Sequence, residues 1–230
     1  MYFNSCYVAR DEAPYTVAMV VLDIAAPIFL MIGLTRCNAA NASLLNNFEI
    51  VATSLIALFL FKEAINKKLW LAIVLVTLSS LLLSFEDMSG FQFSWGSPFV
   101  LLSCVCWGFE NNCTRMLSSK NPAQIVIIKG FGSGIGALIL SLIIGERFFH
   151  IGYIVMVLTL GFVAYGLSVY FYIYAQRYLG AAKTSTYYAL SPFISAGLSF
   201  MISKELPSAI FIVALLIMAA GTYFVSTNKN

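Results

Sequence analysis

Charged side chains are scarce in this sequence of 230 residues: Asp, Glu, Lys and Arg make up 10% of it, and hydrophobic residues make up 60%. A soluble globular domain carries a charge on about a quarter of its residues. A chain with so few charges cannot cover a water-facing exterior, so a soluble fold is excluded. The formal net charge of +3 is small and the basic residues are scattered, so the chain does not have the pattern of a nucleic-acid-binding protein.

Metal ligands and catalytic motifs are also lacking. The chain has one histidine, His150, and its five cysteines form no Cys-x-x-Cys pair. Neither a metal site nor a disulfide framework is indicated, and no cofactor is implied. The sequence contains no HExxH, no GxSxG and no paired catalytic Asp pattern, which disfavours an intramembrane enzyme. Residues 1–15 lack the regions of a signal peptide.

What the sequence does have is a series of long apolar runs. A helix needs about 20 apolar residues to cross the hydrocarbon layer of a bilayer. Within a bilayer each span must satisfy its own backbone hydrogen bonds, as a helix does. We therefore predict an all-α integral membrane protein in contact with the lipid bilayer. The sequence has about eight candidate spans: 16–35, 39–61, 68–85, 97–115, 123–144, 150–176, 181–202 and 206–226.

The basic residues predict the orientation of these spans. One side, formed by the N-terminal tail and every second loop, carries nine of them: Arg10, Lys62, Lys67, Lys68, Arg115, Lys120, Arg177, Lys183 and Lys229. The other side carries three: Arg36, Arg147 and Lys204. Because Lys and Arg are enriched in cytoplasmic loops, the first side is predicted to be cytoplasmic. We expect a multi-pass protein of the plasma membrane with both termini inside the cell.

Two stretches of the chain align when it is shifted by 142 residues. Ala39-Ala40-Asn41-Ala42-Ser43 falls on Ala181-Ala182-Lys183-Thr184-Ser185, and Lys62-Glu63 falls on Lys204-Glu205. Chance similarity between two apolar helices is the alternative explanation. The orientation above puts the two Lys-Glu turns on opposite sides, so the repeats are predicted to be inverted. Inverted repeats form a substrate site at their interface near the membrane midplane.

These same residues resemble a known family. Asn41-Ala42-Ser43-Leu44-Leu45-Asn46-Asn47-Phe48-Glu49, running on to Lys62-Glu63, resembles the first signature of EamA-type transporters of the drug/metabolite transporter superfamily. Gly180 to Ser185, continuing through Leu190-Ser191-Pro192 to Lys204-Glu205, resembles the second. The resemblance implies a carrier of ten helices in two inverted sets of five. Residues 1–88 then form an incomplete first repeat with three helices, its first two missing, and residues 89–230 form a complete second repeat.

Four ionisable residues fall at membrane depth: Asp23, Glu49, Glu110 and Lys129. Such a group costs about 2.5–3.5 kcal/mol even on a lenient insertion scale, so it normally faces protein or a water-filled cavity. Lys129 follows Glu110 across a short turn, so we expect it to approach Glu110 or Asn111. The alternative to a cavity role is a buried ion pair that only holds two helices together.

Two polar stripes are related by the offset of 142. Asn46, Glu49 and Thr53 share one face of the second span. The stripe at the matching positions of the seventh span is Tyr188, Ser191 and Ser195. Matched stripes on two repeats can form a polar cavity between them. The alternative is that these side chains only form hydrogen bonds between helices.

Tyr165 and Tyr172 share a face of the sixth span. They are candidates to line the same cavity. Packing, or an aromatic belt at the membrane interface, is the alternative.

Gly130/Gly134 and Gly132/Gly136 have the GxxxG spacing, which predicts close packing of the fifth span against another helix.

The sequence therefore predicts a secondary carrier that moves small metabolites by alternating access between two repeats. Its partners would be lipid and a small-molecule substrate. The alternative is a truncated, non-transporting membrane subunit that a partner or a homodimer completes.

Overall fold

The computed structural model describes residues 10–36, 42, 45–85, 95–145, 151–191, 193, 194, 198, 201 and 209–227. Over these residues the chain is helical, and no strand occurs among them. The predicted all-α membrane class is confirmed.

The helices coincide with the predicted apolar runs. Their bounds are α1 Ala13–Leu34, α3 Phe48–Phe59, α4 Lys67–Phe85, α5 Ser97–Leu117, α6 Pro122–Ile144, α7 Ile151–Leu160, the π-helix η1 Gly161–Gly166, α8 Leu167–Leu179, α9 Ala181–Tyr188 and α11 Ala209–Ser226. Among the described residues, three continuous segments are long and apolar enough to cross a membrane, namely α1, α6 and the run α7–η1–α8. Two shorter apolar helices are α3 and most of α11. The low hydropathy of α5 has a visible cause, since Glu110, Asn111 and Asn112 lie in its second half.

Proline and glycine mark several helix ends. A proline lies in the first turn of α1, α5 and α6, where its missing N–H costs no hydrogen bond. The side chain of Asn121 caps α6 by accepting a hydrogen bond from the Ala123 amide at 3.0 Å. Gly180 has a φ of +80°, which L residues rarely adopt, and it turns the chain from α8 into α9.

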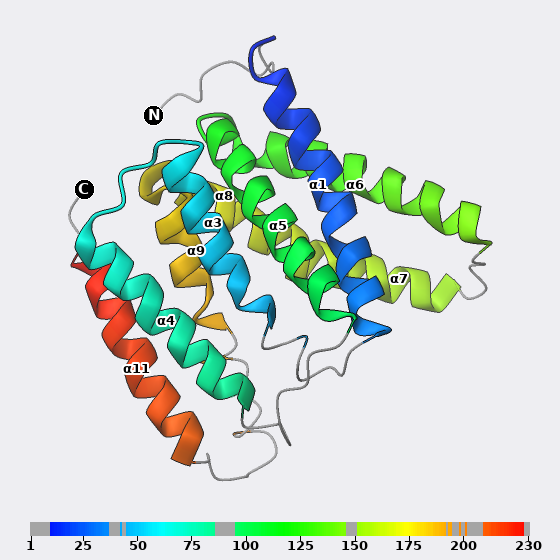
Figure 1. Ribbon diagram of the computed structural model, residues 1–230. Coiled ribbons are helices and arrows are strands. Elements are labelled where there is room, and N and C mark those ends of the chain that lie inside the picture. The colour runs from blue at the N-terminus through cyan, green and yellow to red at the C-terminus, as the bar shows by residue number, and fades with distance from the viewer. Residues whose placement is uncertain are drawn as a thin grey trace.

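The helices form a bundle around α5, which packs along α1 and α3 (Figure 1). At one edge α4 and α11 lie side by side in both views. Met19, Leu117, Ile125 and Ile173 form a core that joins α1, α5, α6 and α8. The helices around this core are those that carry the predicted ionisable residues Asp23, Glu110 and Lys129.

A second core lies between α4, α11, α3 and α9. Ala72 and Val76 of α4 are fully buried in it, together with Ala214 and Met218 of α11. Ala72 and Ala214 differ by 142 positions, as do Val76 and Met218. The starts of α4 at Lys67 and α11 at Ala209 have the same offset. Positions matched by the sequence repeat therefore pack into one core.

The glycines of α6 divide into two faces. Gly132 and Gly136 lie against Val20 and Ile24 of α1, at contacts where a β-carbon would be too close. Gly130 and Gly134 are exposed, and a β-carbon on either would meet no atom within 4 Å. The prediction of close packing is thus confirmed for Gly132/Gly136 and wrong for Gly130/Gly134, because α6 contacts α1 with one face only.

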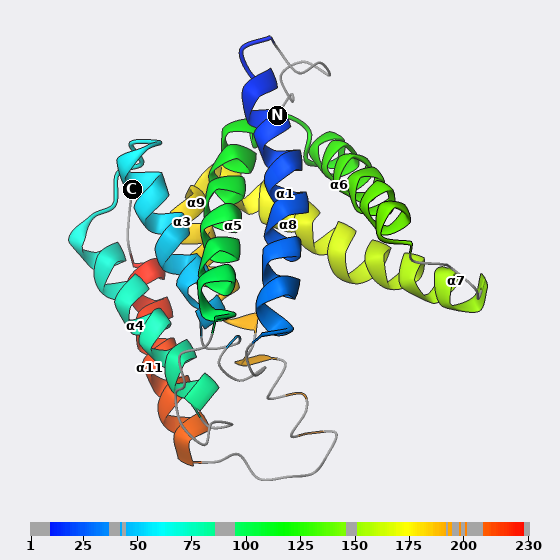
Figure 2. The ribbon, with the colours of Figure 1, turned by 45° about the vertical axis from the view of Figure 1, so that its right-hand side comes forward.

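Apolar exposure is greatest on α6 and α7, which project away from the other helices in both views (Figure 2). No residue of α7 is buried, and the exposed fractions of Ile151 and Leu158 are 80% and 68%. Such a surface is suited to the hydrocarbon of a bilayer and not to water. The chain is a multi-pass membrane protein with lipid-facing helices.

Candidate functional site

A buried ion cluster lies where α1, α5 and α6 meet. The Nζ atom of Lys129 is 3.1 Å from Oε1 of Glu110 and 3.3 Å from Oδ1 of Asp23. All three side chains are less than a tenth exposed. The predicted approach of Lys129 to Glu110 is present, because the short turn between α5 and α6 makes the two helices antiparallel neighbours. The sequence did not predict that Asp23 would be a second partner.

Neutral groups complete this cluster. Thr114, one turn after Glu110 on α5, donates a hydrogen bond from Oγ1 to Oε1 of Glu110. The hydroxyl of Tyr165 donates to Asp23, at 3.1 Å from Oδ2 and 3.4 Å from Oδ1. The ammonium of Lys129 lies 5.9 Å from the centroid of the Tyr165 ring, within range of a cation–π interaction. The ammonium is therefore held by two carboxylates and one aromatic face.

A cavity of about 320 Å³ adjoins the cluster. Nine of the twelve predicted site residues line it: Asp23, Asn46, Glu49, Glu110, Asn111, Lys129, Tyr165, Tyr172 and Tyr188. Four further residues line it as well: Trp107, Thr114, Ser168 and Val169. Among these residues three carry a carboxylate and one carries an ammonium, so the formal charge of the described lining is negative.

Three predicted residues are not among the described lining of this cavity. Thr53 is fully buried behind the wall, where its carbonyl accepts from Nδ2 of Asn112 at 3.0 Å. This contact is possible because Gly108 of α5 lies against the backbone of α3. Ser191 is exposed, since α9 ends at Tyr188 and the turn at residues 189–190 breaks the register that the polar stripe assumed. Ser195 lies outside the described residues.

Glu49 occupies the first turn of α3 at one wall of the cavity. Its Oε1 accepts a hydrogen bond from Nδ2 of Asn111 at 3.1 Å. Two tyrosines of the same wall, Tyr172 and Tyr188, form an edge-to-face pair with centroids 5.4 Å apart. Over the residues the structure describes, no Lys or Arg forms an ion pair with Glu49. This part of the cavity thus combines a carboxylate with aromatic rings.

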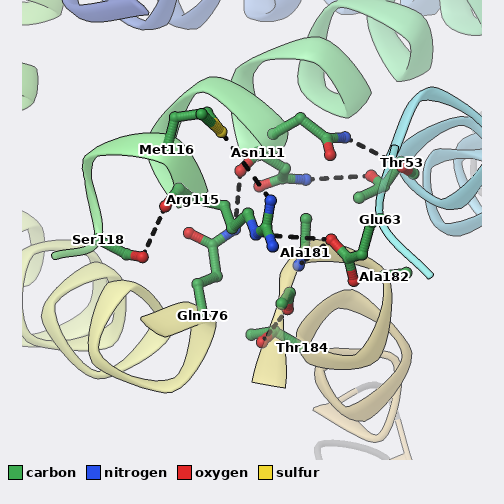
Figure 3. Close-up of polar contacts among 12 residues, drawn as sticks. Thr53, Glu63, Asn111, Arg115, Met116, Ser118, Gln176, Ala181, Ala182 and Thr184 are labelled. Atoms are coloured by element: carbon green, nitrogen blue, oxygen red, sulfur yellow. Dashed lines mark hydrogen bonds and ion pairs between the residues drawn. The ribbon is translucent and has the colours of Figure 1, made fainter. Parts of the chain in front are cut away.

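A second cavity, of about 380 Å³, lies at the end of the bundle where Glu63 and Arg177 are found. Its lining includes a layer of polar residues, Glu63, Arg115 and Gln176, whose contacts are drawn in Figure 3. Gln176, only 1% exposed, donates from Nε2 to the carbonyl of Asn111 at 2.9 Å. Glu63 accepts from the amide of Ala181 at 3.1 Å, and its Oε2 is 3.6 Å from Nε of Arg115. The layer ties α5, α8 and the start of α9 to the segment after α3.

Within the described part of the chain, no group of three or more His, Cys, Asp or Glu side chains is arranged to hold a metal ion. The polar groups of the cavity are carboxylates, amides, hydroxyls and one amine. Such groups can form hydrogen bonds or ion pairs with a polar solute.

Comparison with known proteins identifies the family. The chain matches the EamA-like transporter family over residues 9–85 and 94–227, which is most of its length. The chain belongs to the EamA-like transporter family. The resemblance predicted from the Lys-Glu turns and the Asn41 and Gly180 segments is confirmed.

One sequence relative and one solved structure are similar to this EamA-like chain over most of its length. An uncharacterized transporter from Methanothermobacter thermautotrophicus is 26% identical over 213 residues, covering 89% of this chain and 62% of the relative. The chain thus spans less than two thirds of that relative's length. One crystal structure, described only as that of a protein, matches with a TM-score of 0.79 at 18% identity. It covers 94% of this chain and 76% of the other, and the likeness shows a shared fold.

Several residues of the EamA-like site were not predicted from the sequence. Ser168 lies on the same helical face as Tyr165 and Tyr172, three and four positions away, so the spacing of that face held the signal. Thr114 shares a face with Glu110 and was detectable in the same way. Trp107 lies three positions before Glu110 and four before Asn111, so the same spacing held its signal. The hydrogen bond of Gln176 to Asn111 joins residues 65 positions apart, a contact that spacing along one helix does not predict.

Proposed function

We propose that this chain forms the greater part of a secondary carrier that moves small polar metabolites across the plasma membrane. The observation that carries the proposal is the Asp23–Lys129–Glu110 cluster beside a polar cavity in the middle of apolar helices. Ionisable groups are costly at membrane depth and are retained there mainly where they serve a substrate or ion pathway. Family membership supports the same activity.

A purely structural role for the cluster is the weaker explanation. Buried ion pairs contribute little to stability, because desolvation of the charges offsets their attraction. An ion pair that only joined α5 to α6 would need neither Asp23 nor a cavity next to it. Here all three charged side chains line the cavity, where a solute has access to them.

We also propose that residues 1–88 and 89–230 are inverted repeats that alternate access to the cavity. The support is the offset of 142, which relates α4 to α11 and also separates Asp23 from Tyr165. Asp23 and Tyr165 are hydrogen-bonded to each other. Equivalent residues meet in this way near a two-fold axis that relates two repeats. Rocking of one repeat against the other around such an axis exposes a central site to each side in turn.

The polar layer of Glu63, Arg115 and Gln176 is a second observation that supports alternating access. These residues line the cavity at one end of the bundle, and Gln176 bonds to Asn111, which lines the central cavity. In the proposed cycle this layer closes the central site toward that end. Opening requires Glu63 to release both Arg115 and the start of α9.

The carrier proposal is tested with purified protein in liposomes and radiolabelled amino acids, amines and nucleosides as probes. We expect uptake of at least one probe above that of protein-free liposomes. Glu110→Gln and Lys129→Ala are expected to reduce the initial rate about tenfold or more, because each unbalances the ion cluster. Glu12→Gln is the control, since Glu12 pairs with Lys120 at 3.0 Å away from the cavity. Absence of flux for every probe, or full flux in both cavity variants, contradicts the proposal.

A second candidate function is that of a membrane subunit which a second chain completes, such as another copy in a homodimer. Two observations favour it: α7 has no buried residue, and the chain covers 62% of its curated relative. Native mass spectrometry of the active protein gives its oligomeric state and so distinguishes the carrier from the subunit. Flux from a monomer excludes the subunit, whereas flux that requires a dimer or a second protein supports it.

A further inference from the structure

The carboxylates of the central cavity differ in their partners. Asp23 and Glu110 share the ammonium of Lys129. Glu49 has the amide of Asn111, at 3.1 Å, as its hydrogen-bond donor. No described Lys or Arg ion-pairs with it. Glu49 is therefore the carboxylate of the described lining that has no Lys or Arg within ion-pair distance among the described residues.

The charge balance of the cavity has a direct consequence. The described lining residues include three carboxyl groups and one amine, so the cavity carries two formal negative charges when all four are ionised. Apolar side chains and lipid solvate such charges poorly, because little water reaches this depth. A cation that enters the cavity lowers this cost, and an anion raises it.

Aromatic rings line the same cavity. Trp107, Tyr172 and Tyr188 contribute to the lining, and the two tyrosines pack edge to face at 5.4 Å. A cation is attracted to the face of such a ring, most strongly when it is shielded from water. Lys129 already shows this mode within the cavity, since two carboxylates and the Tyr165 ring hold its ammonium.

We infer that Glu49, together with the Trp107, Tyr172 and Tyr188 rings, binds the ammonium group of a small organic amine. This inference rests on the proposed carrier function and names its substrate class. The volume of about 320 Å³ suits a small solute, since ligand pockets range from about 300 to 1,000 Å³. An amino acid is disfavoured, because its carboxylate would lie among three acidic side chains while Lys129 is already paired with two of them.

Three probes that share a phenyl ring test the charge preference: phenethylamine, phenylalanine and 3-phenylpropionate. Binding to the full chain in lipid nanodiscs is measured by isothermal titration calorimetry at neutral pH. We expect saturable binding of phenethylamine, affinity about tenfold or more weaker for phenylalanine, and no binding of 3-phenylpropionate, because a charged hydrogen bond contributes at least this much.

Variants then test the assigned residues. Glu49→Gln keeps the shape and the Asn111 contact but removes the charge, so phenethylamine affinity should fall about tenfold or more. Glu12→Gln, the matched change outside the cavity, should leave it within about twofold. Tyr188→Leu should weaken binding severalfold, whereas Tyr188→Phe keeps the ring and should not. Glu49→Asp retains the charge and serves as a second variant if Glu49→Gln fails to fold.

Three results would overturn the inference: phenylalanine bound as tightly as phenethylamine, unchanged affinity in folded Glu49→Gln, or no saturable binding of the amine. A flux assay with phenethylamine in liposomes keeps the two proposals apart. Glu49-dependent binding without flux contradicts the carrier and leaves the amine site standing. Flux of another probe without amine binding contradicts the amine site alone.

Discussion

Lys129 is the residue on which the electrostatics of the cavity depend. Its ammonium lies 3.1 Å from Glu110 and 3.3 Å from Asp23, and all three side chains are nearly excluded from solvent. Removing one member of a buried ion pair leaves an uncompensated charge, which costs more than the pair contributed. Here the loss of Lys129 leaves two carboxylates facing each other.

We predict that Lys129→Met lowers the free energy of unfolding by about 3–5 kcal/mol. The triple variant Asp23→Asn/Glu110→Gln/Lys129→Met should recover most of this loss, because it leaves no charge unpaired in the cluster. Unfolding in detergent by increasing fractions of a denaturing surfactant provides the measurement. A triple variant less stable than Lys129→Met would show that the cluster stabilises the fold through its charges.

At the scale of the helix, the position of Lys129 depends on how α6 lies against α1. Gly132 and Gly136 permit that approach, because their missing side chains make room for Val20 and Ile24. Lys129 is three residues before Gly132 on the same helix and extends toward Asp23 of α1. Small residues drive helix association in membranes by allowing such contact. The two glycines therefore help to build the ion cluster as well as the bundle.

We predict that Gly132→Leu lowers stability by about 1–3 kcal/mol through overpacking against α1. Gly134→Leu, two residues along the same helix, should have an effect below about 0.5 kcal/mol, because its side chain meets open space. Thermal unfolding of both variants in the same detergent compares them directly. Equal loss in the two variants would show that the α1 contact is not responsible.

At the scale of the whole molecule, one end of the bundle collects the residues predicted to face the cytoplasm. Lys120 pairs with Glu12 at 3.0 Å, and Arg115 lies 3.6 Å from Glu63. Gly180 and Arg177 line the cavity at this end with Glu63. Trp95 precedes α5 at the opposite end and is 84% exposed. The basic residues of the predicted inner side are thus grouped in space as well as in the loop count.

We predict that Ser119→Cys reacts with a membrane-impermeant maleimide only after the cells are permeabilised, whereas Trp95→Cys reacts in intact cells. The reason is the excess of Lys and Arg at the Ser119 end, which retains loops in the cytoplasm. Cys6 and Cys37 are replaced by serine in both variants to remove background labelling. The reverse pattern would mean that the termini lie outside.

Most of the bundle was predictable because its signals are local in the chain. Runs of apolar residues predict spans one by one, and the Glu110–Lys129 contact follows from a short turn between consecutive helices. Ser191 is exposed and is not in the described lining of the cavity, since the turn after Tyr188 resets the helical register. The π-helix Gly161–Gly166, which carries Tyr165, also had no visible signal. It adds a residue per turn and so changes which side chains face the cavity.

By itself the sequence determined the membrane class, the apolar spans, the offset of 142 and the ionisable residues that cannot face lipid. Each of these follows from composition or from periodicity along one helix. Only the tertiary structure decided that Asp23 pairs with Lys129, that Glu49 lines a cavity with aromatic rings, and that Gln176 and Glu63 bond to Asn111 and the start of α9. These contacts join helices far apart in the chain. They depend on the angle at which the helices cross and on how far each is shifted along its neighbour. The spacing of residues along the sequence contains neither quantity.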